Sequence, residues 1–232
     1  MIKRDKSSLG VLGMGLLSLL LVSFAPGLVW LWYFERYDHR EREPVGMLVR
    51  TFFWGMVMVG PAILFEAPFR SFLSGPSSFG RTLAVSFLVI GLGEEGAKLL
   101  AVFLAAYSSV EFDQVLDGII YSITAALGFA AVENLVYVLK FGPGVALTRG
   151  VIAFLAHASF AGTMGYHLGR AKLVSGSPSR EILRGLGWAV LLHGSYDFIL
   201  LARVGSPVAA AALVVAAYAL LLARIRTAQV QD

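Results

Sequence analysis

Apolar runs of membrane-spanning length follow one another along nearly the whole chain, and no other feature restricts its fold so strongly. About 20 apolar residues in an α-helix cross the hydrocarbon core of a bilayer, where a spanning segment must satisfy its own backbone hydrogen bonds. Charged residues make up 15% of the sequence, against about 25% in soluble domains, and the mean hydropathy is +0.75. The sequence therefore predicts an all-α, polytopic membrane helical bundle.

Short segments rich in charged or turn-forming residues separate the apolar runs. We predict about seven transmembrane helices, with eight as the alternative count, in a single integral-membrane domain over 1–232 with a motif-bearing core at about 81–203. The N-terminal apolar run is too long for a signal peptide and is predicted to be a retained first helix. The expected helices cover about 9–33, 45–67, 81–107, 116–139, 149–173, 182–203 and 206–225.

The net charge of +4 is spread over short loops and tails, which favours a lipid bilayer as the partner and argues against nucleic acid. The chain has no cysteine, so disulfides, thiolate metal ligands and a cysteine nucleophile are excluded. Basic residues do not decide the orientation, because those at 3–6 and those in the 170–184 loop nearly balance under the positive-inside rule.

Three ionisable residues interrupt the third apolar run, in the sequence GLGEEGAKLL at 91–100. Lys98 lies four residues after Glu94 and three after Glu95, so it can pair with either on one helix face. A single Glu–Lys pair would be read as structural. One lysine neutralises only one carboxylate, however, and the second then needs a proton, a metal or another cation.

The fourth apolar run carries Glu133 and Asn134 in GFAAVENLVY. Glu133 has no basic neighbour three or four residues away, so its partner must come from another helix. That requirement favours a functional role, whereas an isolated asparagine is often only a hydrogen-bonding contact between helices.

The fifth and sixth runs supply the histidines. His157 lies deep in its run, and His167 is placed nearly three turns later, at the interface. His193 and Asp197 are four residues apart on one helix face, where the carboxylate can orient the imidazole. A packed histidine and a simple His–Asp helix pair are the structural alternatives.

Antiparallel packing brings these residues to a common depth. If side A denotes the membrane face reached between the second and third helices, Glu94 lies about halfway along its helix and Glu133 about three-quarters of the way back to side A. His157 lies a third of the way in from side A, and His193 lies near mid-membrane with Asp197 closer to side A. Four helices thus contribute acids or imidazoles to one layer, which we interpret as a functional site.

Three acids and two histidines without cysteine suit the activation of water. A carboxylate can act as general base, and a histidine or Asn134 can stabilise the oxyanion. The same groups could instead bind zinc, with His157, His193 and either Glu133 or Glu95 as ligands. Both versions predict hydrolysis, with a buried peptide bond as the expected substrate, and the residues leave the choice open.

Four motifs occur in order: EEGAK (94–98), DGIIYSITAALGFAAVEN (117–134), HASFAGTMGYHLG (157–169) and HGSYD (193–197). Together they resemble the PrsW family of intramembrane proteases, which is distantly related to the CAAX prenyl endopeptidases. In those relatives the first motif typically ends in arginine, where this chain has Lys98. The resemblance covers about 90–200, while the first two helices and the last are generic apolar segments.

The resemblance implies a multi-pass peptidase of the bacterial cell membrane, whose substrate is a membrane-anchored protein. The founding member of the family makes the first cut in an anti-sigma factor, on its extracytoplasmic side. Family members have been classed as metallopeptidases, and the prenyl endopeptidases have been argued to be glutamate peptidases. The functional positions map onto Glu94, Glu95, Glu133, His157 and His193, with Lys98, Asn134 and Asp197 as supporting matches.

Two other classes of function compete with the protease. Buried Glu, His and Asp residues also form proton relays in proton- or ion-coupled transporters, but the sequence has no inverted repeat and no pair of broken helices in matched positions. A non-enzymatic membrane scaffold would not need ionisable residues from four helices in one layer.

Overall fold

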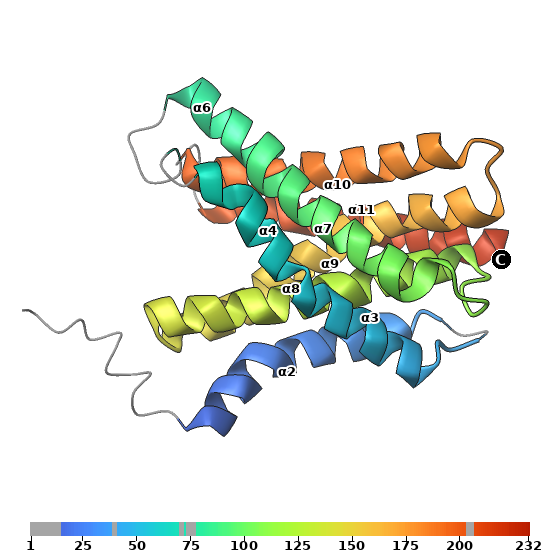
Figure 1. The fold of residues 1–232 in the computed structure, drawn as a ribbon, viewed down its shortest axis with the longest axis horizontal. Coiled ribbons are helices and arrows are strands. Elements are labelled where there is room, and N and C mark those ends of the chain that lie inside the picture. The colour runs from blue at the N-terminus through green and yellow to red at the C-terminus, as the bar shows by residue number, and fades with distance from the viewer. Residues whose placement is uncertain (1–14, 39–40, 70–71, 73–77, 203–206) are drawn as a thin grey trace, which may run out of the picture.

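The computed structural model describes residues 15–38, 41–69, 72, 78–202 and 207–232. Over these residues the chain forms seven continuous helical segments that pack as one bundle (Figure 1), as the sequence predicted. The expected start of the first helix at residue 9 and the basic residues at 3–6 lie outside the described residues, as do residues 74–77 between the second and third expected helices.

The helical segments have the following bounds. They are α2 (Leu16–Glu35); α3 (Val45–Val57) continued by α4 (Val59–Glu66) and the 3₁₀ turn η1 (Ala67–Phe69); α6 (Phe79–Ala84), the π-helix η2 (Val85–Gly91), α7 (Leu92–Val102) and the π-helix η3 (Phe103–Tyr107); α8 (Val115–Phe141); α9 (Gly144–Leu173); α10 (Pro178–Leu201); and α11 (Pro207–Gln231).

Five of these segments are long and apolar enough to cross a membrane: α2, the continuous helix at 45–69, α8, α9 and α11. The two others, 79–107 and α10, have ionisable residues within their apolar sequence. The start of α6 and the C-terminus lie at opposite ends of the bundle (Figure 1). We call these ends the α6 face, where α6 begins at Phe79, and the C-terminal face, where α11 ends at Gln231. The protein is a multi-pass membrane protein.

Helix α8 is the centre of the bundle, and 94% of its most apolar 18-residue stretch is buried. Small residues let its neighbours approach closely, as membrane helices require in the absence of a hydrophobic drive between them. A Cβ added at Gly55 of α3 would collide with the backbone of Ala125 in α8, and one added at Gly165 of α9 would collide with that of Gly118. Glycines therefore allow close packing at these two helix crossings.

The π-helix η2 directly precedes the two glutamates of α7 and crosses α10 at close range. A Cβ on Gly91 would lie 3.3 Å from the backbone nitrogen of Gly194, and one on Gly194 would lie 2.6 Å from Cδ1 of Phe87. This crossing holds α10 against the start of α7, and so positions His193, the neighbour of Gly194, beside the glutamates. π-Helical turns are frequent at functional sites for this kind of local realignment.

Candidate functional site

The ammonium group of Lys98 connects three side chains of the buried layer. Its Nζ lies 2.7 Å from Oε1 of Glu95, 3.3 Å from Oε2 of Glu94 and 2.9 Å from Nδ1 of His157. The lysine is fully buried, which is tolerated because every one of its contacts is an acceptor. The predicted pairing along α7 is confirmed, and Lys98 contacts both glutamates rather than one.

His193 of α10 lies between the two glutamates. Its Nδ1 is 2.7 Å from Oε1 of Glu95, and its Nε2 is 3.8 Å from Oε2 of Glu94. Asp197, one turn later, brings its Oδ2 to 3.4 Å from the same Nε2, although the two atoms are not aligned for a hydrogen bond. The carboxylate of Glu95 thus fixes the orientation of the imidazole and leaves Nε2 facing Glu94.

His157 of α9 is held on both ring nitrogens. Nδ1 lies against Lys98, and Nε2 is 2.9 Å from Oε2 of Glu133 in α8. The His157 and His193 rings are perpendicular, with centroids 5.4 Å apart. The predicted convergence of four helices in one layer is confirmed.

Arg149 is a member of this layer that the sequence did not single out. Its Nη2 lies 2.9 Å from Oε2 of Glu133, and its guanidinium stacks on Tyr137 at 3.7 Å from the ring centroid. Arg149 sits where the fifth helix was expected to begin, and an arginine at a helix end is ordinary. The sequence indicated such a residue only indirectly, because Glu133 has no basic neighbour within one helical turn and so requires a partner from another helix.

Glu66, near the end of the second membrane segment, was also missed. Its half-buried carboxyl interacts electrostatically with Glu94, Glu133 and Asp197. It lies in α4, which packs against α7, so a fifth helical segment adds a charged group near the site.

Two residues singled out in the sequence lie away from the layer. The Asn134 side chain donates to the backbone oxygen of Val22 in α2 at 3.3 Å, because adjacent helical residues point about 100° apart. It ties α8 to α2 and does not face the histidines. His167 forms a separate pair with Glu181 at 2.7 Å, nearly three turns of α9 beyond His157.

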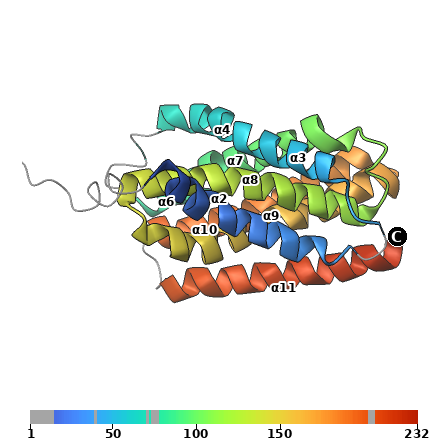
Figure 2. The same cartoon turned by 90° about the horizontal axis from the view of Figure 1, so that it is seen from below.

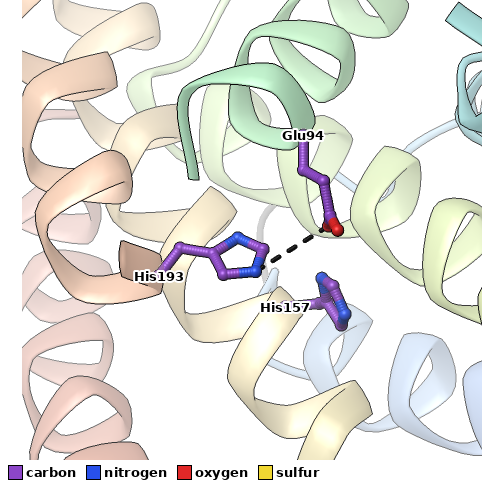
Figure 3. Close-up of side chains that lie close together, drawn as sticks. All are labelled: Glu94, His157 and His193. Atoms are coloured by element: carbon purple, nitrogen blue, oxygen red, sulfur yellow. Dashed lines mark ion pairs between the residues drawn. The ribbon is translucent and has the colours of Figure 1, made fainter. Parts of the chain in front are cut away.

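The side chains of Glu94, His157 and His193 can each offer one ligand atom, and these atoms lie within 4.8 Å of one another (Figure 3). Two imidazoles and one carboxylate form the donor set of hydrolytic zinc sites, so the residues fit a metal. Lys98 contacts Glu94 and His157 and would compete with a cation for both.

The third ligand in this set is Glu94, whereas the sequence predicted Glu133 or Glu95 in that position. Glu133 is held by His157 and Arg149, whereas Glu95 is held by Lys98 and His193. Glu133 therefore orients the ring of His157, and Glu95 orients the ring of His193. This is the usual role of carboxylates around ligating or catalytic imidazoles.

A second carboxyl cluster, Asp38, Glu43 and Asp117, lies at the C-terminal face. Asp117 is 16 residues before Glu133 in α8, about 24 Å along the helix. Asp117 accepts the backbone N–H groups of Asp113 and Gln114, and Glu43 accepts the hydroxyl of Tyr121. These contacts cap α8 and attach the segment before α3 to it.

Burial raises the pKa of Glu43 to about 9, with a further increase from the neighbouring Asp117. The folded protein therefore keeps a proton that the unfolded chain releases near pH 4.5, and the contribution of Glu43 to stability falls as pH rises from about 4.5 to 9. Replacing Glu43 with glutamine should raise the melting temperature at pH 8 and leave it nearly unchanged at pH 5.

Thermal unfolding in detergent across this pH range measures the effect, with exposed Glu41→Gln as the matched control. An equal rise in melting temperature at pH 5 and pH 8, or an equal response in the control, would contradict the assignment.

Comparison with known proteins gives a consistent match. A family model described as PrsW family intramembrane metalloprotease matches residues 43–223. The protease PrsW of Bacillus subtilis (strain 168) is 36% identical over 187 residues, which cover 80% of this chain and 84% of that protein. The protease PrsW of Clostridioides difficile (strain 630) is 36% identical over 191 residues, covering 80% of each chain. No solved structure matches. The match extends beyond 90–200 and includes the second membrane segment and most of the last.

Proposed function

The chain belongs to the PrsW family of intramembrane metalloproteases, and from this premise we propose that it cleaves a membrane-anchored protein at the layer formed by Glu94, His157 and His193. The observation that carries the proposal is the convergence of these three side chains from α7, α9 and α10. Membership of a protease family removes the support for the transporter and scaffold hypotheses.

The two adjacent glutamates differ in how tightly they are held. The Glu95 side chain is fully buried and makes two contacts of 2.7 Å, to Lys98 and His193. The Glu94 side chain is 11% exposed, and its contacts to the same two residues are 3.3 and 3.8 Å. We therefore assign a positioning role to Glu95, and assign Glu94 to the reacting water.

In the version that uses only protein groups, Glu94 removes a proton from water as the water oxygen adds to the carbonyl carbon of the substrate. Glu94 then delivers the proton to the leaving nitrogen. His193 supplies a donor to the negative charge that develops on the carbonyl oxygen, and the buried positive charge of Lys98 adds electrostatic stabilisation. Glu133, itself fixed by Arg149, holds the ring of His157 in place.

A zinc ion held by Glu94, His157 and His193 would supply Lewis-acid polarisation and a water of lowered pKa. In that version Glu94 is a ligand rather than the base. Glu94 is therefore the carboxylate on which both versions depend, and Glu95 and Glu133 keep their positioning roles in either.

The substrate we propose is a single-pass membrane protein cut in the half of the bilayer nearer the α6 face. An outward α6 face would place the basic 170–184 loop in the cytoplasm, in agreement with the positive-inside rule. The family resemblance favours an anti-sigma factor, cut on its extracytoplasmic side.

Metal removal tests the proposal and separates its two versions. Protein reconstituted in proteoliposomes with a single-pass substrate should release a fragment cut within or beside the membrane segment. Activity that is lost on chelation and restored by zinc would support the zinc version. Full activity in protein shown by elemental analysis to be metal-free would support the glutamate version.

The matched control for these assays is Glu41→Gln, an exposed carboxylate at the other end of the bundle, which should cleave like the unmodified protein. If a panel of single-pass substrates, anti-sigma factors included, stays intact under every metal condition, the proposed reaction is wrong.

A further inference from the structure

Another polar cluster, distinct from Asp38, Glu43 and Asp117, lies near the C-terminal face, away from the layer formed by Glu94, His157 and His193. Arg170 of α9 and Arg224 of α11 both place their guanidinium groups over the Tyr166 ring, at 5.8 and 5.0 Å from its centroid. Glu181 accepts from Arg184 at 2.7 Å and pairs with His167 at 2.7 Å. We call these six residues the arginine cluster.

The arginine cluster has more positive than negative charge. Its three arginines face one carboxylate, so its formal charge is +2 with His167 neutral. Glu181 is already engaged by Arg184 and His167, and Arg170 reaches it only at 3.8 Å. Positive charge held on a membrane protein without a matching acid attracts an anion.

Arg224 carries the strongest indication of a missing partner. Within the described part of the chain it forms no ion pair, and its buried Nε has no hydrogen-bond partner. A half-buried guanidinium is costly to leave unsatisfied. Its planar donors suit phosphate oxygens, which can accept two hydrogen bonds from one arginine.

The depth of Arg224 identifies the source of the phosphate. Arg224 lies 17 residues after Pro207, the first residue of α11, or about 26 Å along the helix. That distance brings it near the far edge of a hydrocarbon core of about 30 Å. α11 runs along one edge of the bundle (Figure 2) and presents Val215, which is 64% exposed, to the lipid.

We propose that the arginine cluster binds the headgroup phosphate of an anionic phospholipid, whose acyl chains lie along the exposed side of α11. A zwitterionic lipid fits less well, because its own cation would lie among the arginines. This site is separate from the proposed proteolytic layer and does not depend on it.

Native mass spectrometry of the detergent-solubilised protein with phosphatidylglycerol or phosphatidylcholine tests the proposal without any activity measurement. We expect phosphatidylglycerol to bind at least tenfold more tightly than phosphatidylcholine. Arg224→Gln should weaken phosphatidylglycerol binding about tenfold, the effect of losing one hydrogen bond to a charged group. Arg226→Gln is the matched control, because Arg226 is exposed on the same helix and should leave binding unchanged.

Two further variants keep the test decisive if Arg224→Gln does not fold. Arg170→Gln should also weaken phosphatidylglycerol binding, and Arg224→Lys should weaken it less than Arg224→Gln does, because lysine keeps the charge but loses the planar donors and the stacking on Tyr166. Equal binding of both lipids, or equal losses in Arg224→Gln and Arg226→Gln, would overturn the proposal. Displacement of the lipid by millimolar inorganic phosphate would overturn it too, since the cluster would then be a site for small anions.

Discussion

Replacing Glu94 with glutamine should lower the rate of peptide-bond cleavage by about 10³-fold, within the range for loss of a catalytic general base. Glutamine keeps the size of the side chain but can neither take a proton from water nor contribute an anionic ligand. The loss is therefore expected whether Glu94 activates water directly or binds a metal. The folded protein should be little affected, because the contacts of Glu94 to Lys98 and His193 are the longer ones in the layer.

Cleavage of a single-pass substrate in proteoliposomes and thermal unfolding in detergent measure the two halves of this prediction. Glu95→Gln is the informative comparison. It should reduce both activity and melting temperature, because Glu95 is fully buried between Lys98 and His193. If Glu94→Gln keeps more than a tenth of the activity while Asp197→Asn abolishes it, Asp197 rather than Glu94 handles the reacting water.

The common depth of the functional residues could be predicted from sequence because it depends only on the position of each residue along its helix. Helix rise and antiparallel order place Glu94, Glu133, His157 and His193 in one layer without knowledge of any side-chain direction. The same reasoning gave the number of helices, since the apolar runs have to cross the membrane.

Side-chain direction could not be predicted in the same way, because it depends on the rotation of each helix about its axis. Asn134 and Glu133 are neighbours in sequence, yet one faces α2 and the other faces α9. The π-helix at Val85–Gly91 changes the helical period just before Glu94 and Glu95, so a helical wheel continued through it would misplace both.

The choice among the three glutamates also required tertiary contacts. Arg149, near the start of α9, pairs with Glu133, and His193 of α10 pairs with Glu95. Neither contact has a signal in local spacing, because each joins residues that are far apart in the chain. Glu94 is thus distinguished by what its neighbours bind, and not by its own position in the EEGAK motif.

Replacing Lys98 with methionine should cost about 3–5 kcal/mol of stability, the range for breaking a buried ion pair from one side. Methionine fills a similar volume but leaves Glu95 fully buried without its cation and removes the donor to Nδ1 of His157. His193 alone would then face both glutamates. The expected result is a protein that accumulates poorly or melts well below the unmodified protein in detergent.

Lys140→Met is the matched control, since Lys140 is exposed at the end of α8 and should change stability by less than about 0.5 kcal/mol. Arginine at position 98 keeps the charge, and the related prenyl endopeptidases typically have arginine there, so Lys98→Arg should recover part of the lost stability. A Lys98→Met protein as stable as the control would show that the two glutamates do not need the ammonium group. The distinction between a positioning Glu95 and a reactive Glu94 would then lose its basis, because it rests on Lys98 holding one glutamate more tightly than the other.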